Sequence, residues 1–113
     1  MRAKRAEKAL VILGGDIKTP PLSLTARREI GYLIRKLQLG DSLEMPSSRP
    51  MPVVGSRCHE LRVRDGSHHW RVLYRIDQDA ILVLSVFSKK TRETPRRIIE
   101  QARRLLASYD AGF

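Results

Sequence analysis

Three strand-length runs follow one another closely in the second half of the chain, and they constrain the fold more than any other feature. The runs Cys58 to Arg64 and Trp70 to Ile76 alternate between apolar and polar side chains, as half-buried strands do. The run Ala80 to Phe87 is apolar on both faces, which predicts a buried, central strand. Turn residues separate them, in a hairpin loop at 65–69 and a turn at 77–79. The pattern predicts a meander of three antiparallel strands.

A short strand and an amphipathic helix are predicted before this meander. The strand covers Ala9 to Leu13, and glycines directly after it end it. The helix runs from Leu24 to Leu39, with Ser23 as its N-cap and Gly40 as its C-terminal stop. Its apolar stripe has helical spacing and consists of Ile30, Leu33, Ile34 and Leu37.

A second amphipathic helix is predicted after the meander. It begins with Thr94 as N-cap and Pro95 at the first helical position, and its apolar stripe runs from Ile98 to Tyr109. The proline- and serine-rich segment 41–56 is predicted to be a long loop. The order of elements predicts an α+β domain: a small twisted antiparallel sheet flanked by helices, with both helices packed on one face.

The length of 113 residues fits a single domain spanning 1–113. No apolar run reaches the roughly 18 residues of a membrane span, and the first apolar stretch is too short for a signal peptide. The single cysteine, Cys58, excludes an internal disulfide. These features predict a soluble, cytoplasmic protein without a membrane partner.

The charge balance indicates a polyanionic partner. Lys and Arg number 22 against 12 Asp and Glu, which gives a net charge of +10. Such a field attracts polyanions, and arginine forks suit phosphate geometry. Nucleic acid or a ribonucleoprotein surface is therefore favoured over a charge that serves solubility alone. An acidic protein that masks the basic surface is compatible with either interpretation.

Strand alternation places four arginines on one sheet face. Arg62 and Arg64 of one strand, and Arg71 and Arg75 of its hairpin partner, have only Glu60 to offset their charge. Like charges across a strand pair are destabilising unless a ligand compensates them. We therefore interpret this face as an anion-binding surface, with Arg71 projecting from its open side. The alternative is that the long side chains splay outward and stay solvated.

A second basic cluster leads into the last helix. It comprises Lys89, Lys90, Arg92, Arg96 and Arg97. The cluster lies beside a helix N-terminus, where free backbone N–H groups favour anions and cations are locally unfavourable. Together with the arginine face, it predicts phosphate binding, although a solvated charge run is the simpler alternative.

The remaining chemically interesting residues give weaker signals. Cys58 and His59 are neighbours in a strand, so they point to opposite faces and form no dyad. Two adjacent loop histidines, His68 and His69, rarely bind metal, and the aspartates of the turns are ordinary turn residues. The sequence therefore predicts neither a metal site nor a cofactor. Trp70 is predicted to be part of the core.

Three motifs in order then resemble a known family. They are CHELRVRD, WRVLYRID and DAILVLSVFSKKTRETP, followed by an amphipathic helix. This series is similar to the RelE/HigB superfamily of bacterial toxins, and more closely to its phage-derived, HigB-like branch. The segment KTPPLSLTARREIGYLIRKLQLGDSLEMPSSRPMP also resembles that branch, so that the likeness covers about Lys18 to Tyr109.

The resemblance implies the toxin half of a type II toxin–antitoxin pair. Family members are mRNA interferases, typically cut mRNA on the ribosome, and are neutralised by a cognate antitoxin, with which they can occupy operator DNA. Matched by motif, the basic positions are Arg62, Arg64, Arg71, Lys89 and Lys90. Many RelE-type members also use a tyrosine or histidine near the C-terminal end, and this chain has no obvious equivalent, because Tyr109 falls on the apolar stripe.

For a metal-independent endoribonuclease, these residues suggest a division of roles. Arg62 and Arg71 would stabilise the developing phosphorane, because arginine stays protonated. Lys89 or Lys90 would transfer protons, since crowding by arginines lowers a lysine pKa, and Glu60 and His59 are lesser candidates. Two alternatives remain: a module that binds RNA or the ribosome without cutting, and an inactive phage remnant that binds only an antitoxin in a repressor complex.

Overall fold

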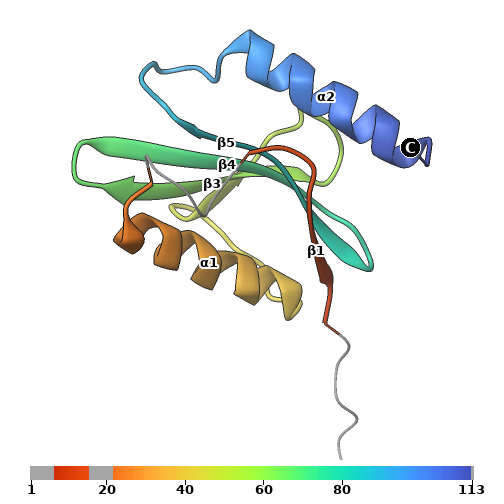
Figure 1. Ribbon diagram of the computed structural model, residues 1–113, viewed down its shortest axis with the longest axis horizontal. Helices are drawn as coiled ribbons and strands as arrows, with labels where there is room; N and C mark the ends of the chain where they lie inside the picture. The colour runs from red at the N-terminus through yellow and green to blue at the C-terminus, as the bar shows by residue number, and fades with distance from the viewer. Residues whose placement is uncertain (1–6, 16–21, 113) are drawn as a thin grey trace, which may run out of the picture.

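The computed structural model describes residues 7–15 and 22–112, and shows a five-stranded sheet with a helix on each side (Figure 1). The strand order across the sheet is β1-β5-β4-β3-β2. The elements in chain order are β1 (Ala9–Ile12), α1 (Leu24–Gln38), β2 (Ser48–Pro50), β3 (Cys58–Asp65), β4 (His68–Ile76), β5 (Ala80–Ser88) and α2 (Arg96–Asp110). The α+β class and the three-stranded meander are as expected.

The hairpin between β3 and β4 is tighter than predicted. Only Gly66 and Ser67 lie between the two strands, and Gly66 has φ 59°, a conformation that glycine adopts without strain. The predicted loop of five residues was wrong, because Asp65 pairs with His68 and extends the ladder to the turn. His68 and His69 therefore belong to β4, so their side chains point to opposite faces of the sheet.

The sheet is wider than the meander and is not wholly antiparallel. β1 pairs in parallel with β5, and the short strand β2 pairs antiparallel with β3 inside the segment predicted to be a loop. β5 is an interior strand, but β4 takes the centre of the sheet. The prediction of β5 as the central strand was wrong because it did not include β2, whose three residues are too few to give a period.

The two helices cover opposite faces, and the expectation that both pack on one face was wrong (Figure 1). Apolar residues of α1 pack with Leu61, Val72 and Tyr74 of the sheet. Those of α2 pack with Cys58, Leu73 and the opposite side of β5. Because β5 is apolar on both faces, it can be covered on both sides.

The helix termini were predicted with different success. The Ser23 hydroxyl accepts the Ala26 N–H at 3.0 Å and caps α1, and Gly40 follows the helix with φ 94°, both as predicted. Helix α2 begins at Arg96 with Pro95 as its N-cap residue, so that the predicted Thr94 cap is wrong. The hydroxyl of Thr94 donates to the buried carboxylate of Glu60 instead. Neither helix has the length and apolar character needed to cross a bilayer.

Candidate anion-binding site

The register of β3 and β4 brings cationic side chains together on the α2 side of the sheet. Arg62 pairs directly with Arg71, and Arg64 pairs with His69 one step nearer the turn. Cys58 and Leu73, which share this face, are packed under α2. The arginines nearer the turn lie beyond them, where they line a cavity rather than the helix interface.

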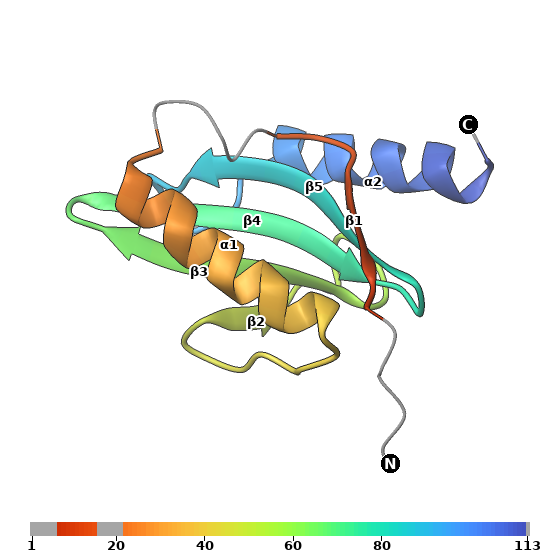
Figure 2. The same ribbon diagram turned by 60° about the horizontal axis from the view of Figure 1, so that its bottom comes forward.

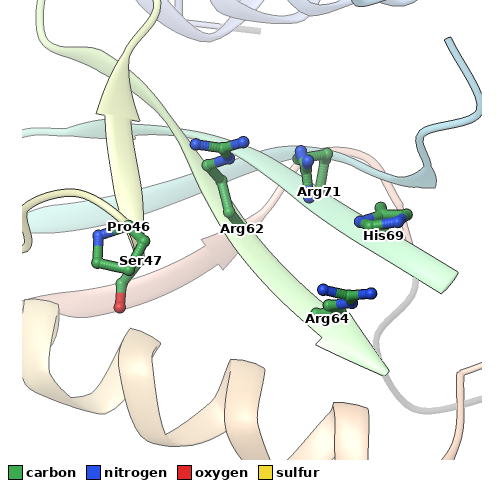
Figure 3. Close-up of a pocket in the computed structure, with 6 residues that line it drawn as sticks. All are labelled: Pro46, Ser47, Arg62, Arg64, His69 and Arg71. Carbon is green, nitrogen blue, oxygen red and sulfur yellow. The ribbon is translucent and has the colours of Figure 1, made fainter. Parts of the chain in front are cut away.

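A cavity of about 410 Å³ opens at this end of the sheet (Figure 3). Its lining comes from β3, β4 and the residues just before β2: Pro46, Ser47, Arg62, Arg64, His69 and Arg71. None of these side chains is acidic. A cavity of this composition suits a phosphate group or another small anion.

A second hollow of about 500 Å³ adjoins the first and shares Arg62, His69 and Arg71 with it. Its other lining residues are Arg49, Lys89, Lys90, Thr91 and Arg92. The backbone N–H of Lys89 donates to the carbonyl of His69 at 2.8 Å, which fixes the segment after β5 beside the start of β4. The two basic clusters of the sequence therefore meet in one continuous site.

A buried carboxylate lies beneath this site. The side chain of Glu60 is 0% exposed, and its Oε1 lies 3.1 Å from Nε of Arg49 and 3.4 Å from Nε of Arg71. Its Oε2 accepts the hydroxyl of Thr94 at 3.1 Å. Because both oxygens are held within the protein, Glu60 positions cations rather than contacting a ligand. It offsets only part of the positive charge around it.

Arg71 is more buried than the sequence suggests. Its side chain is 8% exposed, and one terminal N–H group donates to the Trp70 carbonyl at 3.0 Å. The buried Nε makes no hydrogen bond, and its distance to Glu60 is that of a loose ion pair. Burial, together with Arg62 and Arg49, lowers the pKa of the guanidinium. The expected open position of Arg71 was wrong, because the cavity wall encloses the side chain.

Lys89 lies in a similar field. Burial is the main cause that lowers the pKa of its ammonium, and Arg49, Arg71 and Arg62 lower it further, whereas Glu60 acts in the opposite direction. The sequence predicts the same direction from arginine crowding, but assigns it to charge rather than to desolvation. A lysine with a lowered pKa gives up its proton more readily than a solvated one.

Arg75 lies apart from the cavity, although it shares a sheet face with Arg71. Its guanidinium donates to both oxygens of Asp77 at 2.8 and 3.0 Å, and to both oxygens of Asp110 at 2.9 and 2.7 Å. These bonds raise its pKa. The pairs fasten the end of α2 to β4, so the geometry gives Arg75 a structural role and does not support its predicted contact with RNA.

The other predicted residues are spread around the site. Arg92 lines the second hollow. Arg96 and Arg97 are exposed in the first turn of α2, and Arg96 pairs with Glu100 at 3.0 Å. His59 stacks on Tyr74 with ring centroids 5.4 Å apart, on the α1 side of the sheet. The pocket lies on the other side, so the sheet separates His59 from it and the geometry does not support His59 as its base.

Apart from Thr91, which lies inside the predicted basic segment, sequence reasoning missed four lining residues: Pro46, Ser47, Arg49 and His69. The signal for His69 was present, because it has the same strand parity as Arg71 once the hairpin loop is recognised as two residues long. The other three lie in and before β2, and their proximity depends on a strand pairing that no local pattern announces. Among the described residues, no group of three or more His, Cys, Asp or Glu side chains could hold a metal ion.

Comparison with known families assigns the chain to one of them. A family model described as "Phage derived protein Gp49-like (DUF891)" matches residues 20–107, which include α1, the four strands that follow it and most of α2. A search of curated proteins found no match.

Proposed function

Because this chain belongs to the phage-derived Gp49-like family, a toxin-like family related to the RelE/HigB type, we propose that it is the toxin of a type II toxin–antitoxin pair. In this proposal it acts as an mRNA interferase, a metal-independent endoribonuclease that cuts mRNA on the ribosome and is neutralised by a cognate antitoxin. The family likeness supports the toxin-like role. The chemistry of the site supports the finer proposal.

One observation carries the proposal of cleavage: a buried arginine with unused donors lies in a cavity together with a histidine and beside a lysine of lowered pKa. RNA cleavage without metal proceeds by attack of a 2′-OH on the adjacent phosphorus. It needs positive charge on the phosphorane, a base for the 2′-OH and an acid for the leaving 5′-oxygen. The cavity and the adjoining hollow together provide side chains for all three roles.

The proposed roles follow from position. Arg71 and Arg62 are direct partners across the strand pair and lie side by side, so together they bind the scissile phosphate. His69 and Lys89 lie on the same side and transfer the two protons. Arg64, Arg92 and Lys90 hold the neighbouring phosphates. The products are a 2′,3′-cyclic phosphate and a 5′-hydroxyl.

The test is regulated expression in bacteria, alone and together with the protein encoded beside this chain. We expect growth arrest that co-expression reverses, and new mRNA 5′-ends when purified protein is added to translating ribosomes. Growth arrest without new mRNA 5′-ends would indicate a module that binds the ribosome without cutting mRNA. Absence of arrest would favour an inactive remnant that only binds its antitoxin.

Variants of two neighbouring histidines distinguish an effect on catalysis from an effect on folding. His69 lines the cavity, whereas His68 stacks on Trp70 on the other face, with ring centroids 5.5 Å apart. We expect His69→Gln to slow cleavage by about 10²-fold, the usual contribution of a general acid or base, and His68→Gln to leave the rate unchanged. Equal rates for the two variants would remove His69 from the mechanism.

A further inference from the structure

The outer face of α1 carries large side chains that the fold does not use. Leu24 is 52% exposed and Tyr32 is 60% exposed. With Arg28 between them, they are spaced four residues apart along the helix and therefore form one stripe. The inner face of α1 packs against the sheet, and its outer face is open (Figure 2).

A glycine lies beside this stripe, next to Tyr32, at a position where no contact within the protein requires it. Gly31 is an interior residue of α1, where glycine is less favourable than every residue except proline. A Cβ atom at Gly31 would meet no heavy atom within 4 Å. Gly14 is different, because a Cβ there would come within 2.4 Å of the Leu84 carbonyl oxygen. The fold requires Gly14 but not Gly31, which leaves room for something outside the fold to approach the helix.

Exposed apolar side chains also occur on β1. Leu10 and Ile12 are 37% and 43% exposed, and they point to the α1 side because Val11 and Leu13 pack toward α2. The backbone N–H of Lys8 donates to the carbonyl of Gln38 at 2.9 Å, so the start of β1 is joined to the end of α1. The two elements therefore meet at this point, on the same side of the sheet.

Cations surround this apolar surface. α1 carries four of them, Arg27, Arg28, Arg35 and Lys36, against the single acid Glu29. The ammonium of Lys36 lies 5.5 Å from the ring centroid of Tyr32. Arg35 already binds a carboxylate, that of Glu7, through two hydrogen bonds of 2.7 and 2.8 Å. The charge of the surface therefore complements an acidic partner.

We propose that the outer face of α1 is the docking surface for a partner protein. This surface fits an amphipathic helix that places apolar side chains over Gly31 and Tyr32, and carboxylates beside Arg28 and Lys36. A second copy of this chain fits less well, because each copy has a net charge of +10. On the proposed function, on which this identification rests, the partner is the neutralising antitoxin.

The test is calorimetric titration of the purified chain with the protein encoded beside it. We expect Gly31→Gln to weaken binding at least tenfold, because the added side chain occupies the approach to the helix. The same change improves helix propensity, so the Tm should stay the same or rise by a few degrees. Loss of binding therefore cannot be attributed to unfolding. Tyr32→Ser should also weaken binding.

A matched control is Ala107→Gln, an exposed position on α2, which should bind as the wild type does. If Gly31→Gln and Tyr32→Ser both bind with wild-type affinity, or if the wild-type chain does not bind the neighbouring product, the docking surface is wrong. Binding is measured without reference to toxicity. A chain that binds through α1 but never arrests growth would overturn the proposed function alone, and a neutralised toxin whose α1 variants bind normally would overturn this inference alone.

Discussion

Two arginines four residues apart in β4 have the same burial and opposite surroundings. The side chains of Arg71 and Arg75 are each 8% exposed and lie on the same face of the sheet. Arg75 makes four hydrogen bonds to two carboxylates, whereas Arg71 donates to one backbone carbonyl and approaches one carboxylate loosely. The pKa is raised at Arg75 and lowered at Arg71.

The comparison shows that burial alone does not distinguish a structural cation from a functional one. A buried charge is stable when its donors are paired, and Arg75 meets this condition inside the protein. Arg71 does not, and it faces a cavity with further cations. An anion from outside would complete its hydrogen bonds, which is why the end of the sheet near Arg71, rather than the end near Arg75, is the candidate site.

The largest expected effect is on activity at Arg71. Arg71→Ala should remove transition-state stabilisation worth roughly 3 kcal/mol, or about a hundredfold in the cleavage rate. The variant should also lose about 1–2 kcal/mol of unfolding free energy, because Glu60 stays buried with one cation fewer. Rates on translating ribosomes and urea denaturation measure the two effects. A folded variant with full activity would remove Arg71 from the site.

Arg75→Ala should show the reverse pattern. It leaves Asp77 and Asp110 without their main partner, and we expect a loss of about 2 kcal/mol of unfolding free energy. The cleavage rate per folded molecule should change by less than about twofold. Arg57→Ala is the control, since Arg57 is exposed and reaches Asp77 only at 3.4 Å. A selective loss of cleavage in Arg75→Ala would contradict the assignment of a structural role to Arg75 and a functional role to Arg71.

Glu60→Gln should shift the pH dependence of cleavage. Glu60 raises the pKa of Lys89 against the stronger effect of burial, so removal of its charge should lower that pKa further. If neutral Lys89 is the base, activity rises as pH increases through this pKa, and the rising limb should move to lower pH in the variant. If the rising limb of the pH–rate profile does not move in a folded variant, Lys89 does not titrate in the reaction.

The smallest effect is expected at Asp110. Hydrogen bonding to Arg75 lowers the pKa of Asp110 below its ordinary value of 3.8, so its ionised form stabilises the fold near neutral pH. This contribution is lost as pH falls through the lowered pKa. Asp110→Asn should therefore lower the Tm by about one or two degrees at pH 6, and this difference should shrink as pH falls through the lowered pKa. A difference that does not shrink as pH falls would indicate a cause other than this ion pair.

Much of the site could be predicted because strands alternate. The parity of β3 and β4 places Arg62, Arg64 and Arg71 on one face, and the structure keeps them there. Parity could not show that Arg75 meets Asp110, which is 35 residues away in the chain. It also could not show that β2 carries Arg49 to Glu60, because three residues are too short for a recognisable period.

The sequence by itself determined the three-stranded meander, both amphipathic helices and the basic character of one sheet face. Each depends on periodicity or composition, which are local. The tertiary structure decided the pairing of β1 and β2, the placement of the helices on opposite faces, and which arginines keep unused donors. These depend on long-range contacts, whose energies are set by the partners that meet in space rather than by neighbours in the chain.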